Sequence, residues 1–129
     1  MTYKLASSTW DDKEINALNR VIDSDKYSMG KEVETYEKDF ANFFGSKYSV
    51  MVSSGSTANL LMIAALFFTK NKNIKLSRGD EIIVPSVSWS TTYFPLQQYG
   101  LKLVFVDIDK DTLNYDLKKL QSSISDNTK

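Results

Sequence analysis

The stretch that decides the fold is Ser-Ser-Gly-Ser-Thr-Ala-Asn at residues 53–59. It follows a short apolar run at 48–52 and precedes a long one at 60–68. This order predicts a strand, a small polar turn and a helix. The first N–H groups of a helix have no partner within it and carry partial positive charge, and Gly55 lets a ligand approach the backbone closely. The turn is therefore expected to hold a phosphate group.

Two hydroxyl side chains, Ser56 and Thr57, add possible donors to this turn. The alternative is an ordinary strand-to-helix loop, because serine, glycine and threonine all favour turns and caps. The stretch contains neither the Gly-Lys-Ser/Thr of a P-loop nor the spaced glycines of a dinucleotide-binding fold. An ATPase or a nicotinamide-dependent dehydrogenase is therefore disfavoured.

The composition indicates one domain, residues 1–129, with sixteen basic and sixteen acidic residues. Such a balance gives no field that favours a nucleic acid or an anionic membrane as partner. The apolar run at 60–68 is too short for a membrane span, and the N-terminus leads into no apolar signal segment, so a cytoplasmic protein is expected. The chain has no cysteine and no histidine, which leaves lysine, tyrosine or a shifted carboxylate for acid–base chemistry.

The first part of the chain, residues 1–46, is predicted to be a helical segment. Apolar residues at helical spacing predict a helix over 11–24, with Thr9 as its N-cap and Asp12 completing a capping box. Residues 25–30 interrupt the pattern as a loop. A second amphipathic helix follows, with Gly45 as its C-terminal stop.

From residue 47 to 129 short β-type runs alternate with helical patterns. The predicted strands are 48–52, 81–84 and 102–106, and the predicted helices are 57–68, a second within 89–99 and a third over 116–124. Alternation of this kind predicts an α/β fold of three α/β/α layers with a mostly parallel sheet covered on both faces. Three strands are few for such a sheet, so we expect the chain to be the front portion of a longer protein.

A second candidate for ligand binding is Trp89, which follows the strand predicted at 81–84. Ligands of open parallel sheets bind outside the carboxyl ends of the strands. The indole could stack on a flat heteroaromatic ring whose phosphate lies in the turn at 53–59. The alternative is that Trp89 packs in the core under its helix.

Two polar segments complete the candidates. The loop formed by Asp25, Lys26, Tyr27 and Ser28 has groups that suit a sugar or a diphosphate, or else it is a solvated connection. The acidic run at 107–111 does not have the spacing of a calcium-binding EF-hand loop, so turn formation is the favoured interpretation and no metal site is predicted.

Taken together, these motifs resemble the N-terminal part of the DegT/DnrJ/EryC1/StrS family, the sugar aminotransferases of the fold type I pyridoxal-phosphate class. The matching segments are 5–10, 29–30, 36–37, 54–59, 79–85, 88–92 and 106–109. The opening segment and the tryptophan at position 89 resemble the branch that removes the C3 hydroxyl of a GDP-linked 4-keto-6-deoxyhexose. Perosamine-type aminotransferases are the alternative within the family.

The resemblance implies the cofactor pyridoxal 5′-phosphate or pyridoxamine 5′-phosphate. Gly55, Ser56 and Thr57 would hold its phosphate, and Trp89 would stack on its pyridine ring. The loop from Asp25 to Ser28 would contact the nucleotide-sugar substrate, with active sites shared across a homodimer. The resemblance further implies a role in lipopolysaccharide O-antigen sugar biosynthesis.

The family's proton-transfer base and its carboxylate partner for the pyridinium nitrogen match no position of this chain and are expected beyond Lys129. The 129-residue chain alone is therefore expected to have little or no turnover. Two other interpretations remain open: a non-catalytic binding or dimerisation module that keeps the phosphate turn, and an unrelated nucleotide-binding α/β domain.

Overall fold

The computed structural model describes residues 6–129, and the chain divides into two compact units between Met51 and Val52. Residues 1–5, which include the start of the N-terminus and Leu5 of the opening motif, lie outside the described residues. Along residues 6–129, no helix is both long and apolar enough to cross a membrane. Each unit is described by itself below.

The first unit contains two helices, α1 (Asp12–Asp23) and α2 (Lys31–Phe44). The predicted cap of α1 was wrong by two residues, because Asp11 and not Thr9 is the N-cap. The Asp11 carboxylate accepts the Lys13 N–H at 2.7 Å, and Glu14 accepts the Asp11 N–H at 2.8 Å. A carboxylate at the positive end of the helix is the stronger cap, so the reciprocal pair forms there.

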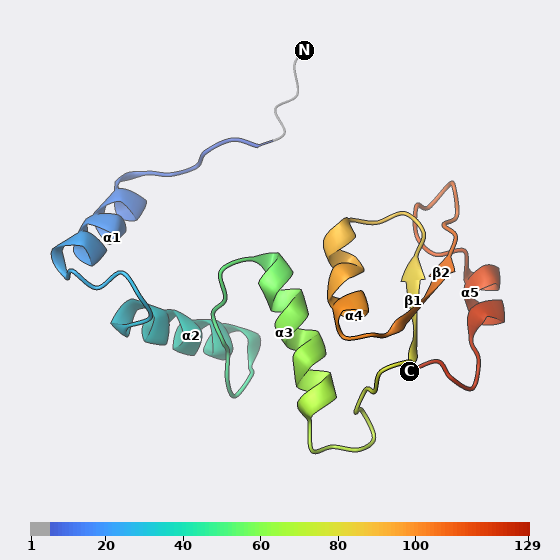
Figure 1. The fold of residues 1–129 in the computed structure, drawn as a ribbon. Coiled ribbons are helices and arrows are strands. Elements are labelled where there is room, and N and C mark those ends of the chain that lie inside the picture. The colour runs from blue at the N-terminus through green and yellow to red at the C-terminus, as the bar shows by residue number, and fades with distance from the viewer. Residues whose placement is uncertain (1–5) are drawn as a thin grey trace, which may run out of the picture. The chain divides into compact units, whose positions relative to one another are not determined.

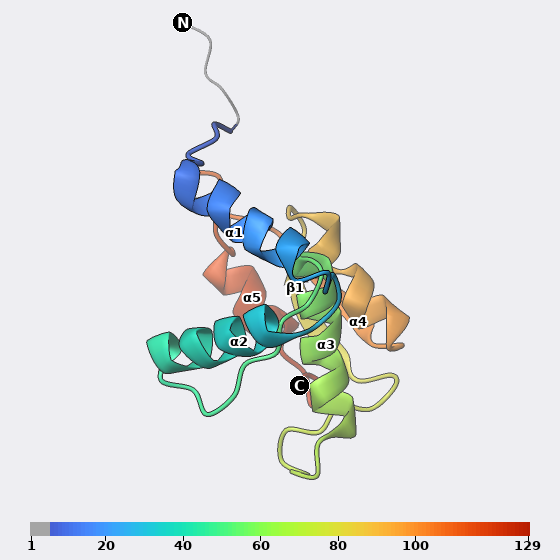
Figure 2. The ribbon, with the colours of Figure 1, turned by 90° about the vertical axis from the view of Figure 1, so that its left-hand side faces the viewer.

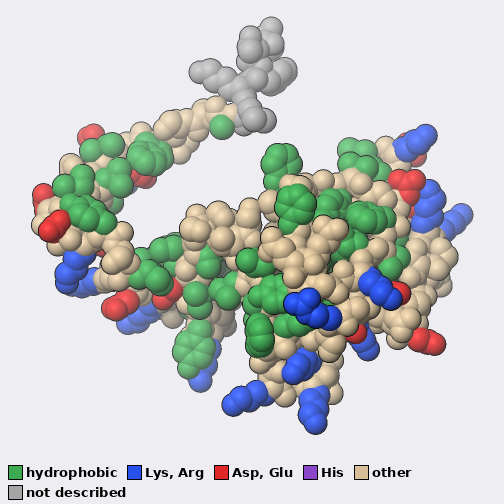
Figure 3. Space-filling model, viewed as in Figure 1, with side chains coloured by type: hydrophobic (Ala, Val, Ile, Leu, Met, Phe, Trp, Pro, Cys, Tyr) green, Lys and Arg blue, Asp and Glu red, His purple; other side chains and the backbone are tan. Residues whose placement is uncertain are grey.

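Gly45 ends α2, as predicted. Its φ of 66° lies in the left-handed region, which glycine adopts without steric penalty. Ala41 is the one buried residue of α2, whereas its aromatic side chains stack along the helix and stay largely exposed. Figure 3 shows hydrophobic side chains at the surface of this unit next to acidic and basic ones.

The strand predicted at 48–52 is absent. These residues pair with no strand among residues 6–129, and a strand is defined by its hydrogen-bonded neighbour. The segment is held instead by side chains of its surroundings: Glu37 accepts the Met51 N–H at 2.7 Å, and the Ser46 hydroxyl donates to the Tyr48 carbonyl at 3.1 Å.

The second unit has an α/β arrangement, which confirms the predicted fold class. Its elements are α3 (Gly55–Phe68), β1 (Glu81–Pro85), the 3₁₀ turn η1 (Ser90–Thr92), α4 (Phe94–Gln98), β2 (Lys102–Val106) and α5 (Leu117–Ser123). Strands β1 and β2 are parallel, with Glu81 opposite Lys102 and Pro85 opposite Val106. Helices α3 and α4 lie on one side of this pair and α5 on the other (Figure 1). The view in Figure 2, turned by 90°, again places β1 between α4 and α5.

The helix predicted within 89–99 is split in two. Pro95 sits in the first turn of α4, where its missing N–H is no loss, so the chain makes a short 3₁₀ turn first and begins the α-helix afterwards. After α4, Gly100 takes a φ of 77° and turns the chain into β2.

The core of the second unit lies between the sheet and the α3–α4 layer. It is formed by Leu76, Val84, Leu96 and Leu101, all less than a tenth exposed, and Ile63 and Phe67 are among the partly buried residues packed against it. Helix α3 is apolar around its circumference from residue 60 onward, although none of its residues is fully buried in the described part of the chain.

A third parallel segment touches β1 at its first residue. Thr128 forms an isolated parallel bridge with Glu81: the Glu81 N–H donates to the Asn127 carbonyl at 3.2 Å, and the Lys129 N–H donates to the Glu81 carbonyl at 3.0 Å. Glu81 therefore has a neighbour on each side, β2 on one and residues 127–129 on the other.

Candidate functional site

The turn at 53–59 forms the N-terminal cap of α3. The Ser54 hydroxyl accepts the Thr57 N–H at 3.2 Å, and the Thr57 hydroxyl accepts the Ser54 N–H at 3.0 Å. The Thr57 hydroxyl also donates to the Ser54 carbonyl at 2.8 Å. This reciprocal arrangement is a capping box with threonine in the place usually held by glutamate, and it begins α3 two residues earlier than the helix predicted at 57–68.

The capping box leaves two backbone donors free at the tip of the turn. The Thr57 N–H and hydroxyl are engaged with Ser54, whereas the N–H groups of Gly55 and Ser56 have no acceptor among residues 6–129. Gly55 and Ser56 are both exposed. A β-carbon added at Gly55 would meet no atom within 4 Å, so the space in front of these donors is open. Two free N–H groups at the positive end of a 14-residue helix can bind a phosphate.

Trp89 lies on the loop that follows β1, directly before η1, and its side chain is 76% exposed. The alternative in which this indole packs in the core is therefore wrong. The loop itself is ordered by hydrogen bonds: the Thr92 N–H donates to the Trp89 carbonyl at 2.9 Å, and the Tyr93 hydroxyl donates to the Pro85 carbonyl at 2.7 Å. The exposed indole of Trp89 is thus carried by a short, hydrogen-bonded turn.

The two turns belong to the same unit and are joined by one side chain. The Asn59 amide, in the second turn of α3, donates to the Thr91 carbonyl in η1 at 3.2 Å. Asn59 and Thr91 are both half-buried. The structure thus links the helix that carries the phosphate turn to the loop that carries Trp89.

The predicted substrate loop belongs to the first unit and lies between α1 and α2. Lys26, Tyr27 and Ser28 line a hollow of about 430 Å³ together with residues of both helices, among them Arg20 and Lys31. Asp25 forms the corner of the loop, with a left-handed φ of 51°. Three cationic side chains and one carboxylate, that of Glu32 at 4.0 Å from Arg20, line this hollow. The excess of positive charge suits a ligand with negative charge, such as a diphosphate.

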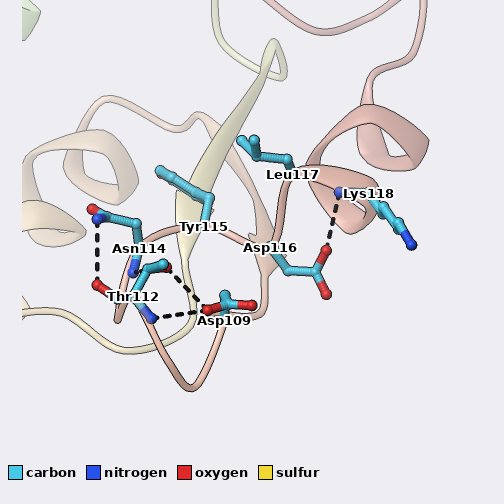
Figure 4. A pocket seen from close by; sticks show the side chains of 7 residues that line it. All are labelled: Asp109, Thr112, Asn114, Tyr115, Asp116, Leu117 and Lys118. Carbon is cyan, nitrogen blue, oxygen red and sulfur yellow. Dashed lines mark hydrogen bonds between the residues drawn. The ribbon is translucent and has the colours of Figure 1, made fainter.

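The acidic run at 107–111 forms a turn, as predicted. Asp109 accepts the N–H group of Asp111 at 3.0 Å. It also accepts the N–H group of Thr112 at 2.9 Å and the Thr112 hydroxyl at 3.1 Å (Figure 4). These bonds hold the pKa of the Asp109 carboxyl below its ordinary value of 3.8. A hydrogen bond from Lys119 at 3.0 Å likewise lowers the pKa of Asp107.

This turn and the start of α5 line a hollow of about 550 Å³. Its polar groups mostly bond to one another: Asp116 caps α5 through the Lys118 N–H at 3.0 Å, and the Asn114 amide donates to the Thr112 carbonyl at 3.4 Å (Figure 4). The hollow is therefore a by-product of turn and cap formation.

Comparison with known proteins identifies the family of this chain. Residues 8–129 match the DegT/DnrJ/EryC1/StrS aminotransferase family. The chain belongs to this family.

Two relatives show the range of activities in the family. GDP-4-keto-6-deoxy-D-mannose 3-dehydratase of Yersinia pseudotuberculosis is 70% identical over 129 residues, which is all of this chain and 32% of that protein. dTDP-3-amino-3,6-dideoxy-alpha-D-galactopyranose transaminase of Aneurinibacillus thermoaerophilus is 36% identical over 118 residues, 91% of this chain and 30% of that protein. The chain spans about a third of the length of the curated relatives it matches.

A solved structure confirms the predicted fold class. The Escherichia coli GDP-4-keto-6-deoxy-D-mannose-3-dehydratase with bound hydrated PLP superposes with a TM-score of 0.89 at 64% identity, over 99% of this chain and 32% of that one. The described residues thus have the fold of the corresponding part of a pyridoxal-phosphate-binding dehydratase.

The sequence analysis gave no role to Asn59, which closes the stretch 53–59, or to Tyr93, although both fix the geometry of the candidate site. One signal was available for Asn59: it is the last polar residue before the apolar run at 60–68. Tyr93 gave no such signal, because a tyrosine beside phenylalanine and proline reads as part of a core.

Proposed function

We propose that this chain supplies the phosphate cradle and the ring-stacking residue of a PLP- or PMP-dependent enzyme that removes the C3 hydroxyl of a GDP-linked 4-keto-6-deoxyhexose. The 70% identity to the Yersinia dehydratase over the whole chain is the observation that carries this proposal. It goes together with the features expected for the cofactor: two free N–H groups, open space before Gly55 and an exposed indole in the same unit.

The residues present fit a phosphorylated pyridine. Gly55 and Ser56 would donate their N–H groups to the phosphate, with Thr57 holding the cap in shape and the Ser56 hydroxyl as a further donor. Trp89 would lie against the ring and shield one of its faces from water. When bound, the cofactor supplies an electron sink for the bond cleavage at the sugar.

The substrate would be positioned by the loop Asp25, Lys26, Tyr27 and Ser28. The cations Arg20, Lys26 and Lys31 around its hollow support this assignment, because the two phosphates of a nucleotide sugar carry negative charge. The hydroxyls of Tyr27 and Ser28 suit a sugar. None of the chain's residues is assigned to proton transfer.

Transamination of a nucleotide sugar is the second candidate, favoured by the 36% identity to the Aneurinibacillus transaminase. The phosphate cradle and the stacking residue serve both reactions equally, since both begin with the same cofactor. The identity of 70% against 36% favours the dehydratase.

The wider setting that we propose is the one that the resemblance to the family implies. We place the protein in the cytoplasm as a homodimer that makes a deoxysugar for lipopolysaccharide O-antigen, without a nucleic acid, membrane or metal partner. Domain organisation is proposed as one transferase large domain, with residues 1–46 as its helical start and 47–129 as the βαβ part.

The phosphate cradle is tested with Gly55→Val. In a chimera, this chain replaces the matching segment of the Yersinia dehydratase. Binding of pyridoxamine phosphate to the chimera is measured by equilibrium dialysis. A valine side chain fills the open space in front of the two donors without touching any protein atom within 4 Å at its β-carbon. We expect binding to weaken at least tenfold, about 1.4 kcal/mol, while the fold persists.

Ala65→Val is the matched control, because it places the same side chain on the exposed surface of α3, away from the turn. It should leave binding unchanged. Equal affinity in the Gly55→Val and Ala65→Val chimeras would show that the cradle is misassigned. Product analysis of the active chimera separates the two reactions, since deoxygenation yields a 3-deoxy sugar and transamination an amino sugar.

A further inference from the structure

Asn59 holds a particular place between the two parts of the candidate cofactor site. It lies four residues after Gly55 on the same helix, and its side chain reaches the loop that carries Trp89. The bond joins positions 32 residues apart. Among residues 6–129, it is the one side-chain hydrogen bond between α3 and the segment 86–92.

The chemistry of this bond is unambiguous. The partner is the Thr91 carbonyl oxygen, which only accepts, so the Asn59 group facing it is the amide NH₂. Both residues are half-buried, and a bond shielded from water is not readily replaced by one to solvent. Loss of the donor would leave the Thr91 carbonyl unpaired at that spot.

The other side-chain hydrogen bonds of the loop do not connect it to α3. The Tyr93 hydroxyl reaches back to Pro85, and the Ser88 hydroxyl meets that of Thr92 at 3.1 Å, so both stay within the loop and its flanking residues. They set the shape of the loop. Its position relative to α3 depends, among side-chain hydrogen bonds of the described chain, on Asn59.

We propose that Asn59 is a positioning residue that sets the separation between the phosphate cradle and the Trp89 indole. A phosphorylated pyridine has a fixed distance between its phosphate and its ring, so a ligand gains from both contacts only if they are held at that distance. Asn59 acts through Thr91 and Trp89 and touches no ligand itself. The inference rests on the proposed function for the identity of the ligand.

The proposal predicts different effects on two ligands. Asn59→Leu and Asn59→Asp both remove the N–H donor, one with a neutral and one with a nearly isosteric side chain. In the chimera, each should weaken pyridoxamine phosphate about threefold to tenfold, as expected for one lost hydrogen bond. Inorganic phosphate needs only the cradle, so in Asn59→Leu, which adds no charge, its affinity should stay within about twofold of the parent.

Thr91→Ala is the matched control. It alters the bonded residue but keeps its backbone carbonyl, so the Asn59 bond and both affinities should persist. In combination with Trp89→Ala, Asn59→Leu should weaken pyridoxamine phosphate no further, because the positioned group is already gone. Equal weakening of both ligands by Asn59→Leu would overturn the proposal, as would full additivity with Trp89→Ala.

A ligand-free measurement separates this inference from the proposed function. In the full chain with Trp10→Phe, Trp89 is the sole tryptophan. Time-resolved fluorescence anisotropy should show faster local motion of Trp89 in Asn59→Leu than in the parent or in Thr91→Ala. Unchanged motion overturns the positioning role. Failure of the parent chimera to bind pyridoxamine phosphate, with the anisotropy difference present, overturns the proposed function and leaves the anchoring role of Asn59 standing.

Discussion

The two units differ in where their apolar residues lie. In the second unit, side chains from α4, β1 and the connecting loops meet in one core, with Val84 3% and Leu96 7% exposed. In the described part of the first unit Ala41 alone is buried, and the apolar faces of α1 and α2 remain exposed, Phe43 by 83%. Periodicity and capping can therefore form helices, whereas a core requires segments that are distant in sequence.

The largest expected effect comes from truncating a core residue of the second unit. Leu96→Ala leaves a cavity next to Val84 and Leu101 and should lower the free energy of unfolding of that unit by about 2–5 kcal/mol. Hydrogen exchange of the β1 and β2 amides, followed by mass spectrometry, measures it region by region.

Leu18→Ala is the counterpart in α1, where the leucine side chain is 48% exposed. It should change the exchange of the α1 amides by less than about 1 kcal/mol, because little burial is lost and alanine is the better helix former. A loss at Leu18 as large as that at Leu96 would mean that the first unit has a core of its own, and the contrast would fail.

A second pair of substitutions compares a glycine from each unit. Gly100 has a φ of 77°, and a β-carbon there would lie 3.3 Å from the Arg78 side chain, so Gly100→Ala should destabilise the second unit by about 1–2 kcal/mol. Gly30 has an extended backbone and its nearest neighbour is the Ser28 carbonyl oxygen at 3.7 Å.

Gly30→Ala should therefore cost less than about 1 kcal/mol, chiefly through a poorer helix cap. Urea unfolding followed by exchange reports both substitutions. If Gly30→Ala proved the more harmful of the two, the backbone of the first unit would be under more constraint than its exposed side chains indicate.

The smallest effect is expected at the surface of the second unit. Lys119 donates to Asp107 at 3.0 Å and lowers the pKa of that carboxyl, so Lys119→Met should raise the pKa of Asp107 towards 3.8. The stabilisation from a depressed carboxyl pKa is present above 3.8 and disappears as the pH falls through the folded value. The parent chain and Lys119→Met should therefore become equally stable in acid.

Carboxyl carbon shifts in an NMR titration measure this directly. Asp109 is the internal control, since the pKa of its carboxyl is lowered by Thr112 and Asp111 and not by Lys119. A shift at Asp109 equal to that at Asp107 would show that the turn rearranges, in place of a single lost ion pair.

Much of the second unit could be predicted from its sequence. The bounds of β2 agree with the predicted 102–106, and β1 differs from the predicted 81–84 only by Pro85. These runs are short, apolar and bounded by glycine, proline or aspartate, so local pattern and tertiary position agree. The run at 48–52 shows the opposite case: its pattern favours a strand, but a strand also needs a neighbour, which no local pattern supplies.

The candidate site could be predicted only in part for the same reason. Gly55 and Trp89 were recognisable because each follows an apolar run at a turn. The bond between Asn59 and Thr91 was not, because it joins two turns whose proximity exists only after folding. The allocation of Thr57 to the cap was likewise hidden, since its hydroxyl could equally have faced outward.

The pairing of Glu81 with residues 127–129 bears on self-association. Alternate residues of β1 turn their backbone groups away from β2, beginning with Glu81, whose N–H and carbonyl are both taken. Pro85, at the far end, has no N–H, and its carbonyl accepts the Tyr93 hydroxyl. On this edge of β1, Ile83 is the one residue left in the described chain with both a free backbone donor and a free backbone acceptor. An intruding strand from another molecule would find too few partners there to nucleate edge-to-edge aggregation.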